Sequence, residues 1–168
     1  MSQLSLSLDS SLLVRDVMGD YRPANADEVL EAARCVLAGQ MRGCEALTSP
    51  QVVRDFLRVK LGTLEHEVFA VIHLNAQNRV IDYVEMFRGT VSQTSVYPRE
   101  VVKEALARNS AALLLVHNHP SGAAEPSRAD EMLTQTLKSV LALVDVRVLD
   151  HLIVAGSAIL SFAERGLL

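Results

Sequence analysis

Two short, dense apolar runs constrain this chain most, because each has the length and composition of a buried strand. They are Val68–Leu74 and Ala111–His117, and turn signals bound both of them. A turn at 75–78 and a loosely alternating stretch at 79–86 follow the first run, so this region predicts a β-hairpin. A Pro/Gly-containing loop at 118–126 follows the second run. Neither run approaches the roughly 18 apolar residues that a membrane-spanning helix needs, and we expect no membrane segment.

Helical periodicity accounts for most of the remaining chain. Apolar residues recur at helical spacing in four segments: 26–40, 50–61, 98–109 and 127–144. Two further short strands are predicted at 146–154 and 159–161. This alternation without internal repeats predicts one α/β domain, preceded by an N-terminal helical segment at 25–62. Residues 1–24 show no sustained period and end in a turn pattern at Arg22–Asn25, so we expect a loosely ordered arm or a segment that docks on a partner.

Composition excludes several classes of protein. Lysine and arginine number 16 against 20 aspartates and glutamates, and the net charge of −4 argues against nucleic acid as a partner held mainly through its phosphates. An apolar fraction of 49% excludes general disorder. Two cysteines provide neither a disulfide framework nor an all-cysteine zinc site. The N-terminus lacks the basic start of a signal peptide, so we expect a cytoplasmic protein with reduced cysteines.

A histidine pair at the end of the second apolar run is the main candidate for chemistry. His117 and His119 are two residues apart, so strand geometry would point both imidazoles to one side. Two such histidines can bind one metal ion at about 2.0–2.1 Å per bond. Asp130 returns in the first turn of the next predicted helix, and its carboxylate could be a third ligand. This set would leave a fourth tetrahedral position for water, as catalytic zinc sites do.

The same residues also have a purely structural interpretation. A histidine pair of this kind is weak evidence for a metal when taken alone. Ser127 and Asp130 fit the S-x-x-acid pattern of a helix start, with Ser127 as the N-cap and Asp130 near the positive end of the helix. The two interpretations are compatible, because a capping hydroxyl that accepts a backbone N–H can still donate its own proton.

Taken together, residues 117–130 read H-x-H-P-S-G-x-x-x-P-S-x-x-D, which resembles the JAMM metalloprotease signature. Four other stretches resemble the RadC family more closely still: Phe87–Thr90, Val96–Ala105, Leu149–His151 and Phe162–Gly166. The resemblance extends over roughly residues 26–168 and makes 63–168 a RadC-like JAMM (MPN) domain. The chain departs from the family pattern at Tyr97, where RadC proteins usually carry histidine.

The resemblance implies both a fold and an activity. The fold is a mixed β-sheet between helices in a single domain, related to cytidine deaminase. The site is one zinc ion per chain, bound by His117, His119 and Asp130. A glutamate earlier in the chain would activate the zinc-bound water, and Ser127 would help to stabilise the tetrahedral intermediate. The implied function is a zinc metallopeptidase or isopeptidase that hydrolyses an amide bond in a peptide or protein.

Three glutamates are candidates for the base: Glu65, Glu67 and Glu85. The resemblance favours Glu67, which opens the predicted strand with the spacing of the RadC stretch. At a sheet end its carboxylate would be partly desolvated, which raises a carboxylate pKa toward values useful for a base. The structural alternative is a solvated charge at the strand edge. Glu65 is the fallback, because it shares a face with Glu67 if the strand extends back.

Two rival functions follow from the same sequence. One is a non-catalytic metal-binding or interaction module associated with DNA repair or mobile elements, since RadC proteins traditionally carry a repair label. The other is a deaminase, which the lack of a C-x-x-C motif disfavours. Asp150 and His151 are adjacent and would point to opposite faces of a strand, so one of them could support a ligand histidine from behind.

Overall fold

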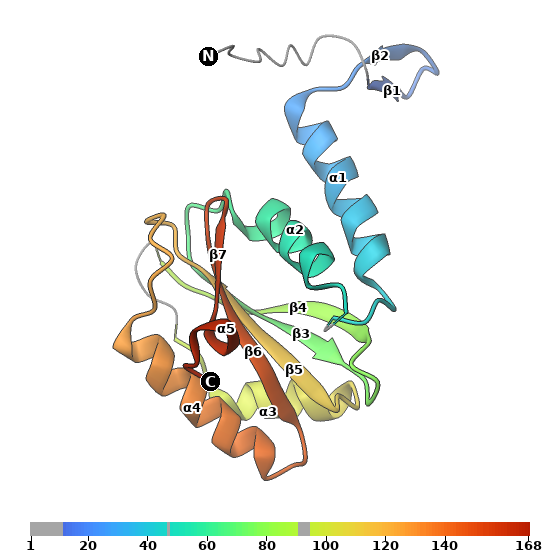
Figure 1. Ribbon diagram of the computed structural model, residues 1–168. Coiled ribbons are helices and arrows are strands. Elements are labelled where there is room, and N and C mark those ends of the chain that lie inside the picture. Colours follow the sequence, from blue (N-terminus) through green and yellow to red (C-terminus); the bar gives the residue numbers. More distant parts are fainter. Residues whose placement is uncertain (1–11, 47, 91–94) are drawn as a thin grey trace.

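The computed structural model describes residues 12–46, 48–90 and 95–168 (Figure 1). Its elements in chain order are β1 (Leu13–Arg15), β2 (Tyr21–Pro23), α1 (Ala26–Met41), α2 (Pro50–Leu61), β3 (Val68–Leu74), β4 (Val80–Arg88), α3 (Pro98–Ala107), β5 (Ala112–Asn118), α4 (Arg128–Ala142), β6 (Arg147–Ala155), β7 (Ala158–Ser161) and α5 (Phe162–Arg165).

A five-stranded sheet in the order β4-β3-β5-β6-β7 forms the centre of the fold. The β5–β6 pair is parallel and the other three pairs are antiparallel. Helix α4 connects the parallel pair, as a parallel connection requires a crossover. Helix α2 lies on one face of the sheet and helices α3 and α4 lie on the other (Figure 1). This mixed sheet between helices confirms the predicted single α/β domain.

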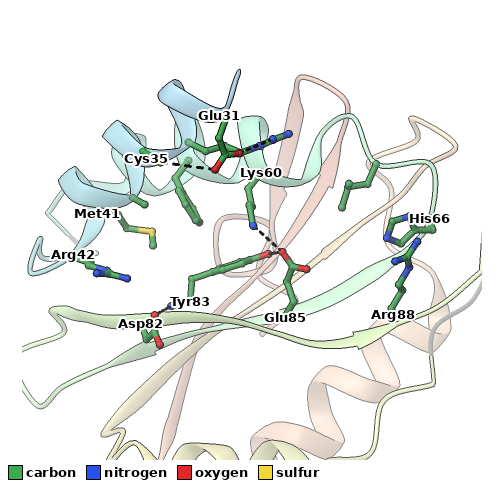
Figure 2. A pocket seen from close by; sticks show the side chains of 14 residues that line it. Glu31, Cys35, Met41, Arg42, Lys60, His66, Asp82, Tyr83, Glu85 and Arg88 are labelled. Atoms are coloured by element: carbon green, nitrogen blue, oxygen red, sulfur yellow. Dashed lines mark hydrogen bonds and ion pairs between the residues drawn. The ribbon is translucent and has the colours of Figure 1, made fainter. Parts of the chain in front are cut away.

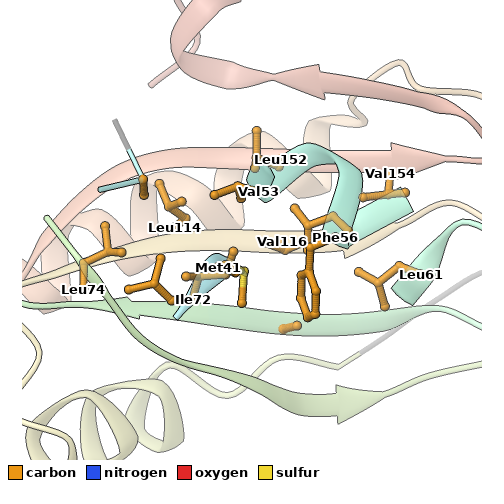
Figure 3. Packing of buried hydrophobic residues seen from close by; sticks show 14 of the residues in the cluster. Met41, Val53, Phe56, Leu61, Ile72, Leu74, Leu114, Val116, Leu152 and Val154 are labelled. Carbon is orange, nitrogen blue, oxygen red and sulfur yellow. The ribbon is translucent and has the colours of Figure 1, made fainter. Parts of the chain in front are cut away.

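The two apolar runs became the central strands for the reason that the sequence suggested. Every residue of β3 and of β5 is buried, because helices cover both faces of the sheet. Alternate side chains enter two separate cores. Ile72 and Leu114 pack with Phe56 of α2 in the core that Figure 3 shows. Phe69 and Leu115 pack on the opposite face with residues of α3 and α4.

The N-terminal segment differs from the sequence prediction. Strands β1 and β2 pair as a short antiparallel hairpin, so Arg22 and Pro23 belong to a strand and not to the expected turn. The hairpin lies beyond the first turn of α1 (Figure 1), and its strands have no buried residue. An exposed hairpin leaves no apolar alternation in its sequence, which explains why periodicity did not reveal it. Residues 1–11 of the expected arm lie outside the described residues.

The start of α1 shows how the hairpin is joined to the helix. Asn25 caps the helix, and its side chain accepts the N–H of Glu28 while the Glu28 carboxylate accepts the N–H of Asn25. The Arg22 guanidinium binds the same carboxylate through two hydrogen bonds of 2.9 and 2.6 Å. The pKa of Glu28 falls to about 2 because of these bonds, first the one from Arg22.

One buried histidine on β3 lies away from the motif histidines. His73 is completely buried, and its Nδ1 lies 2.8 Å from the Ser110 hydroxyl. Its Nε2 has no hydrogen-bond partner in the described part of the chain. Burial lowers the pKa of His73 to about 4, the charge of Arg108 acts in the same direction, and Glu104 and Asp82 oppose it. The imidazole is therefore neutral in the folded protein near neutral pH.

We expect the burial of neutral His73 to make the folded protein less stable as the pH falls. The unfolded chain takes up this proton near pH 6.5 but the folded chain only near pH 4, so the stabilisation is complete above 6.5 and is lost as the pH falls toward 4. When the pH is lowered from 7.5 to 5, the free energy of unfolding should fall by about 2 kcal/mol more in the wild type than in His73→Gln, as measured by urea unfolding. Equal losses in both proteins would contradict a neutral, buried His73.

Candidate metal centre

The structure brings the three sequence-predicted metal ligands to one point. His117 lies near the end of β5, His119 follows that strand, and Asp130 is in the first turn of α4. The His117 and His119 Nε2 atoms are 2.9 Å apart. The Asp130 carboxylate lies 3.3 Å from His117 Nε2 through Oδ1 and 3.6 Å from His119 Nε2 through Oδ2. One potential ligand atom from each of the three residues lies within 4.8 Å of the other two, as binding to one metal ion requires.

Helix capping positions the aspartate. Ser127 is the N-cap of α4, and its hydroxyl oxygen accepts the N–H of Asp130 at 3.2 Å. Asp130 Oδ2 accepts the N–H of Ser127 and the Ser127 hydroxyl, each at 2.7 Å. One carboxylate oxygen is thus held by the cap, while Oδ1 remains directed at His117. The capping interpretation and the ligand interpretation are both compatible with this geometry.

The other ring nitrogen of each histidine, Nδ1, lies within hydrogen-bond distance of a second partner. His119 Nδ1 lies 2.7 Å from the carbonyl oxygen of Ala123, in the loop that leads to α4. His117 Nδ1 lies 2.9 Å from His151 Nε2. Metal-binding histidines usually have such an outer partner, which fixes the orientation of the ring. The donor set and its outer contacts therefore fit a cation such as Zn²⁺, which accepts two imidazole nitrogens and a carboxylate oxygen.

His151 is the member of the adjacent pair that supports the site. It is completely buried, and its ring also contacts Phe69 and Phe162 edge-on or tilted. Burial holds the pKa of His151 well below its usual range. Asp150 has a different role, because its carboxylate accepts the Ser161 hydroxyl at 2.6 Å and the N–H of Ala163 at 2.9 Å. These bonds hold the start of α5.

The charges at the site influence one another strongly. Burial alone would raise the pKa of Asp130, but hydrogen bonds from His117 and His119 hold that pKa well below its usual range. The hydrogen bond with Asp130 is the main cause of a raised pKa of His119, and the negative charge of Glu67 acts in the same direction. An anionic Asp130 at neutral pH is the form that binds a metal ion.

Glu67 lies immediately before β3 and close to His119, one of the candidate metal ligands. The antiparallel register between β3 and β5 ends with Phe69 opposite His117, two residues from Glu67 and from His119 along the chain. Glu67 is half-buried, and its backbone bonds to Thr90 and Gly89 on the neighbouring chain segment. The negative charge of Glu67 acts on His119, so the carboxylate lies near that histidine, and its role as a base stays a prediction.

The other two glutamates lie in different surroundings. Glu65 is exposed and precedes the start of β3, so the strand does not extend back to it. Glu85 pairs with Ala70 in the sheet and forms an ion pair of 3.2 Å with Lys60 of α2. That pairing places Glu85 on the sheet face that α2 covers, away from the metal ligands.

Asn118 contributes to the site and was not singled out from the sequence. Its side chain accepts the N–H of Val68 at 2.8 Å and donates to the carbonyl oxygen of His66 at 3.0 Å. These two bonds tie the backbone on either side of Glu67 to the strand that carries His117. The signal available in the sequence was an amide residue between two candidate ligands. Its partners are 50 and 52 residues away along the chain, so the sequence alone could not indicate its role.

A single α/β domain in which an H-x-H pair and a helix-start aspartate converge beside a glutamate has the architecture of a JAB-type domain. Residues 47–167 match the family model described as "RadC-like JAB domain". The chain therefore belongs to the RadC-like JAB domain family, as its sequence motifs suggested. None of the described helices is both long enough and apolar enough to cross a membrane.

Two relatives show how far the similarity extends. A UPF0758 protein of Leptothrix cholodnii is 60% identical over 151 residues, which cover 90% of this chain and 68% of the relative. A UPF0758 protein of Aromatoleum aromaticum is 61% identical over 152 residues, with the same two coverages. The aligned part therefore represents about two thirds of each relative. Neither name states an activity.

Proposed function

We propose that this protein is a zinc-dependent hydrolase that cleaves an amide bond in a peptide or protein. The observation that carries the proposal is the convergence of His117, His119 and Asp130 at one point, with the Glu67 charge close to His119. Membership in the RadC-like JAB family supports the same chemistry. The site contains both a set of metal ligands and a carboxylate outside that set, which is the combination that hydrolysis needs.

The residues have separate roles in the proposed reaction. A bound zinc ion would polarise the scissile carbonyl and lower the pKa of a bound water toward about 7. His117, His119 and Asp130 would hold it. Glu67 would accept a proton from the attacking water and return it to the leaving amine, so one carboxylate would act first as the base and then as the acid. The amide C–N bond breaks, the water oxygen becomes part of the new carboxyl group, and that group releases its remaining proton to solvent.

A search for reaction products in a mixture of peptides tests the proposal. Zinc-loaded protein would be incubated with peptides derived from cell extract and with peptides that carry amide-linked lysine side chains. Mass spectrometry would identify new amino termini and newly freed lysine amines. Products that depend on both zinc and Glu67 would support the hydrolase. Zinc binding without any product would favour the non-catalytic metal-binding module.

Ser127 provides a prediction that separates capping from catalysis. Ser127→Ala should cost about 0.5–2 kcal/mol of stability, because the N-cap of α4 is lost. The Ser127 hydroxyl donates to Asp130 Oδ2 in this structure, so the change should also lower turnover by about 10²–10³ if that hydroxyl turns to the developing oxyanion during the reaction. Ser127→Thr, which keeps the hydroxyl, should restore both properties. A loss of thermal stability with unchanged turnover would leave Ser127 as a cap alone.

A further inference from the structure

A buried chain of hydrogen bonds joins the ligand His117 to the backbone of α4. His117 Nδ1 lies 2.9 Å from His151 Nε2, and His151 Nδ1 lies 2.6 Å from the Thr134 hydroxyl oxygen. The Thr134 hydroxyl in turn lies 2.6 Å from the carbonyl oxygen of Asp130. His151 and Thr134 are both 0% exposed, so the central part of the chain is shielded from solvent.

The carbonyl at the end of this chain fixes the direction of every bond in it. A carbonyl oxygen only accepts, so the Thr134 hydroxyl donates to Asp130 and must itself accept from His151 Nδ1–H. A neutral imidazole carries one proton, which leaves His151 Nε2 as an acceptor. His117 Nδ1 therefore donates to it, which leaves His117 Nε2, the atom that faces Asp130, as the ring nitrogen available to a metal ion.

We propose that Thr134 is a positioning residue that keeps the His151 proton on Nδ1, so that His117 donates from Nδ1 and offers Nε2 to a metal ion. Without the threonine hydroxyl, His151 Nδ1–H loses its acceptor, and the proton of His151 can reside on Nε2 instead. His151 would then donate to His117 Nδ1, which leaves Nε2 as the only ring nitrogen of His117 that can hold a proton, and that proton competes with a metal ion. The inference rests on the ligand set of the proposed function but not on hydrolysis.

Nitrogen NMR of the metal-free protein tests this directly. With ¹⁵N-labelled histidine, wild type and Thr134→Ser should show His151 with its proton on Nδ1, whereas Thr134→Val should show a substantial His151 Nε2–H fraction. Zinc affinity should fall by about 10–100-fold in Thr134→Val, the usual effect of losing an outer partner of a metal-bound histidine, and recover in Thr134→Ser. Thermal unfolding would show that the variants are folded, and Thr134→Ala would replace a misfolded valine variant.

Two results would overturn the role of Thr134. One is a wild-type tautomer of His151 in folded Thr134→Val, and the other is an unchanged zinc affinity in that variant. If the wild type itself bound no zinc, the proposed function would fail, but the nitrogen shifts would still decide the tautomer.

A separate observation concerns a cleft on the other face of the sheet. It has a volume of about 530 Å³ and lies between α1, α2 and β4 (Figure 2). Phe56 and Tyr83 form part of its lining and pack edge-to-face with ring centroids 5.2 Å apart. Lys60 in the middle is already paired with Glu85. The cleft contains none of the three candidate metal ligands.

Two arginines at opposite ends of this cleft have no carboxylate partner among the described residues. Figure 2 shows Arg42 near Asp82 at one end and Arg88 near His66 at the other. Asp82 and Arg88 are six positions apart on β4, which corresponds to about 20 Å. A small anion cannot contact both arginines across that distance. Glu31, Asp82 and Glu85 also line the cleft and would repel a continuous run of phosphates.

We infer that this cleft binds an extended polypeptide segment with acidic residues near both ends. A polypeptide can place carboxylates against Arg42 and Arg88 and neutral residues between them, which matches the alternating charges of the lining. The His66 end adjoins Glu67 along the chain, so a bound segment would approach the sheet end that carries the metal ligands. In this respect the inference rests on the proposed function and names its substrate class.

Peptide binding tests this inference separately from hydrolysis. A fluorescein-labelled octapeptide with two glutamates at each end and four central alanines should bind metal-free protein at low salt in an anisotropy titration. Its lysine counterpart should not. The double variant Arg42→Ala/Arg88→Ala should weaken binding by about tenfold, from two exposed charge pairs. Arg99→Ala/Arg147→Ala removes the same charge from two exposed sites outside the cleft and should change binding less than about twofold.

Three results would overturn the acidic polypeptide as the ligand. They are no binding of the glutamate peptide, an equal loss in both double variants, or tighter binding of a single-stranded oligonucleotide than of the peptide. None of these results depends on whether the protein hydrolyses an amide.

Discussion

Replacement of Glu67 by glutamine is expected to leave zinc bound and to lower turnover by about 10²–10⁴, the usual contribution of a general base. Glutamine is nearly isosteric with glutamate and can still bond to a water molecule, but it cannot accept a proton at neutral pH. The metal ligands His117, His119 and Asp130 are untouched by this change. Turnover on the substrates identified by mass spectrometry and zinc content by elemental analysis would be measured on the same preparation.

Glu65→Gln is the matched control, because it removes the same charge two residues away. Glu65 is exposed and lies outside β3, so its loss should change turnover little. The reverse outcome would assign the base to Glu65. Unchanged turnover in both variants would exclude this segment as the source of the base. Glu85 would then be the remaining sequence candidate, although its ion pair with Lys60 lies on the other sheet face.

Loss of a ligand should have the largest effect on metal binding. His117→Ala and Asp130→Ala should each weaken zinc binding by more than the roughly 10–100-fold that follows loss of an outer partner, because a three-ligand site cannot lose one ligand without reorganising. Asp130→Ala should also cost about 0.3–1 kcal/mol through the lost charge at the start of α4. Competition titration with a zinc chelator would give both affinities.

A histidine outside the site provides the comparison for these ligand variants. His66→Ala removes an imidazole close to the same sheet end without touching the convergent ligand set. It should bind zinc as the wild type does. Equal zinc affinity in His117→Ala and the wild type would contradict the ligand assignment.

The sequence predicted those elements whose burial leaves a pattern in a single segment. Strands β3 and β5 are apolar at almost every position because helices cover both sheet faces, and their limits differ from the prediction by one residue at most. The β1–β2 hairpin was missed because its strands are held by backbone pairing and have no buried side. Helix α5 has only four residues, which is too short for a helical period to show.

In the candidate site, too, the sequence predicted some residues and not others. His117, His119 and Asp130 lie within one motif, so their spacing was sufficient to nominate them. The sequence did not single out Thr134 and Asn118, because their roles depend on partners in distant segments of the chain. The Thr134 hydroxyl meets a histidine 17 residues away, and the Asn118 amide meets backbone groups 50 residues away or more. Only the folded sheet brings such groups together.

The metal content of the purified protein tests the central claim most directly. Wild-type protein prepared without chelators should contain about one zinc ion per chain by elemental analysis, because two imidazoles and one carboxylate converge on a single point. A variant lacking both His117 and His119 should contain almost none. A folded wild-type protein that neither retains zinc nor binds it on titration would contradict the metal centre and the hydrolase built on it.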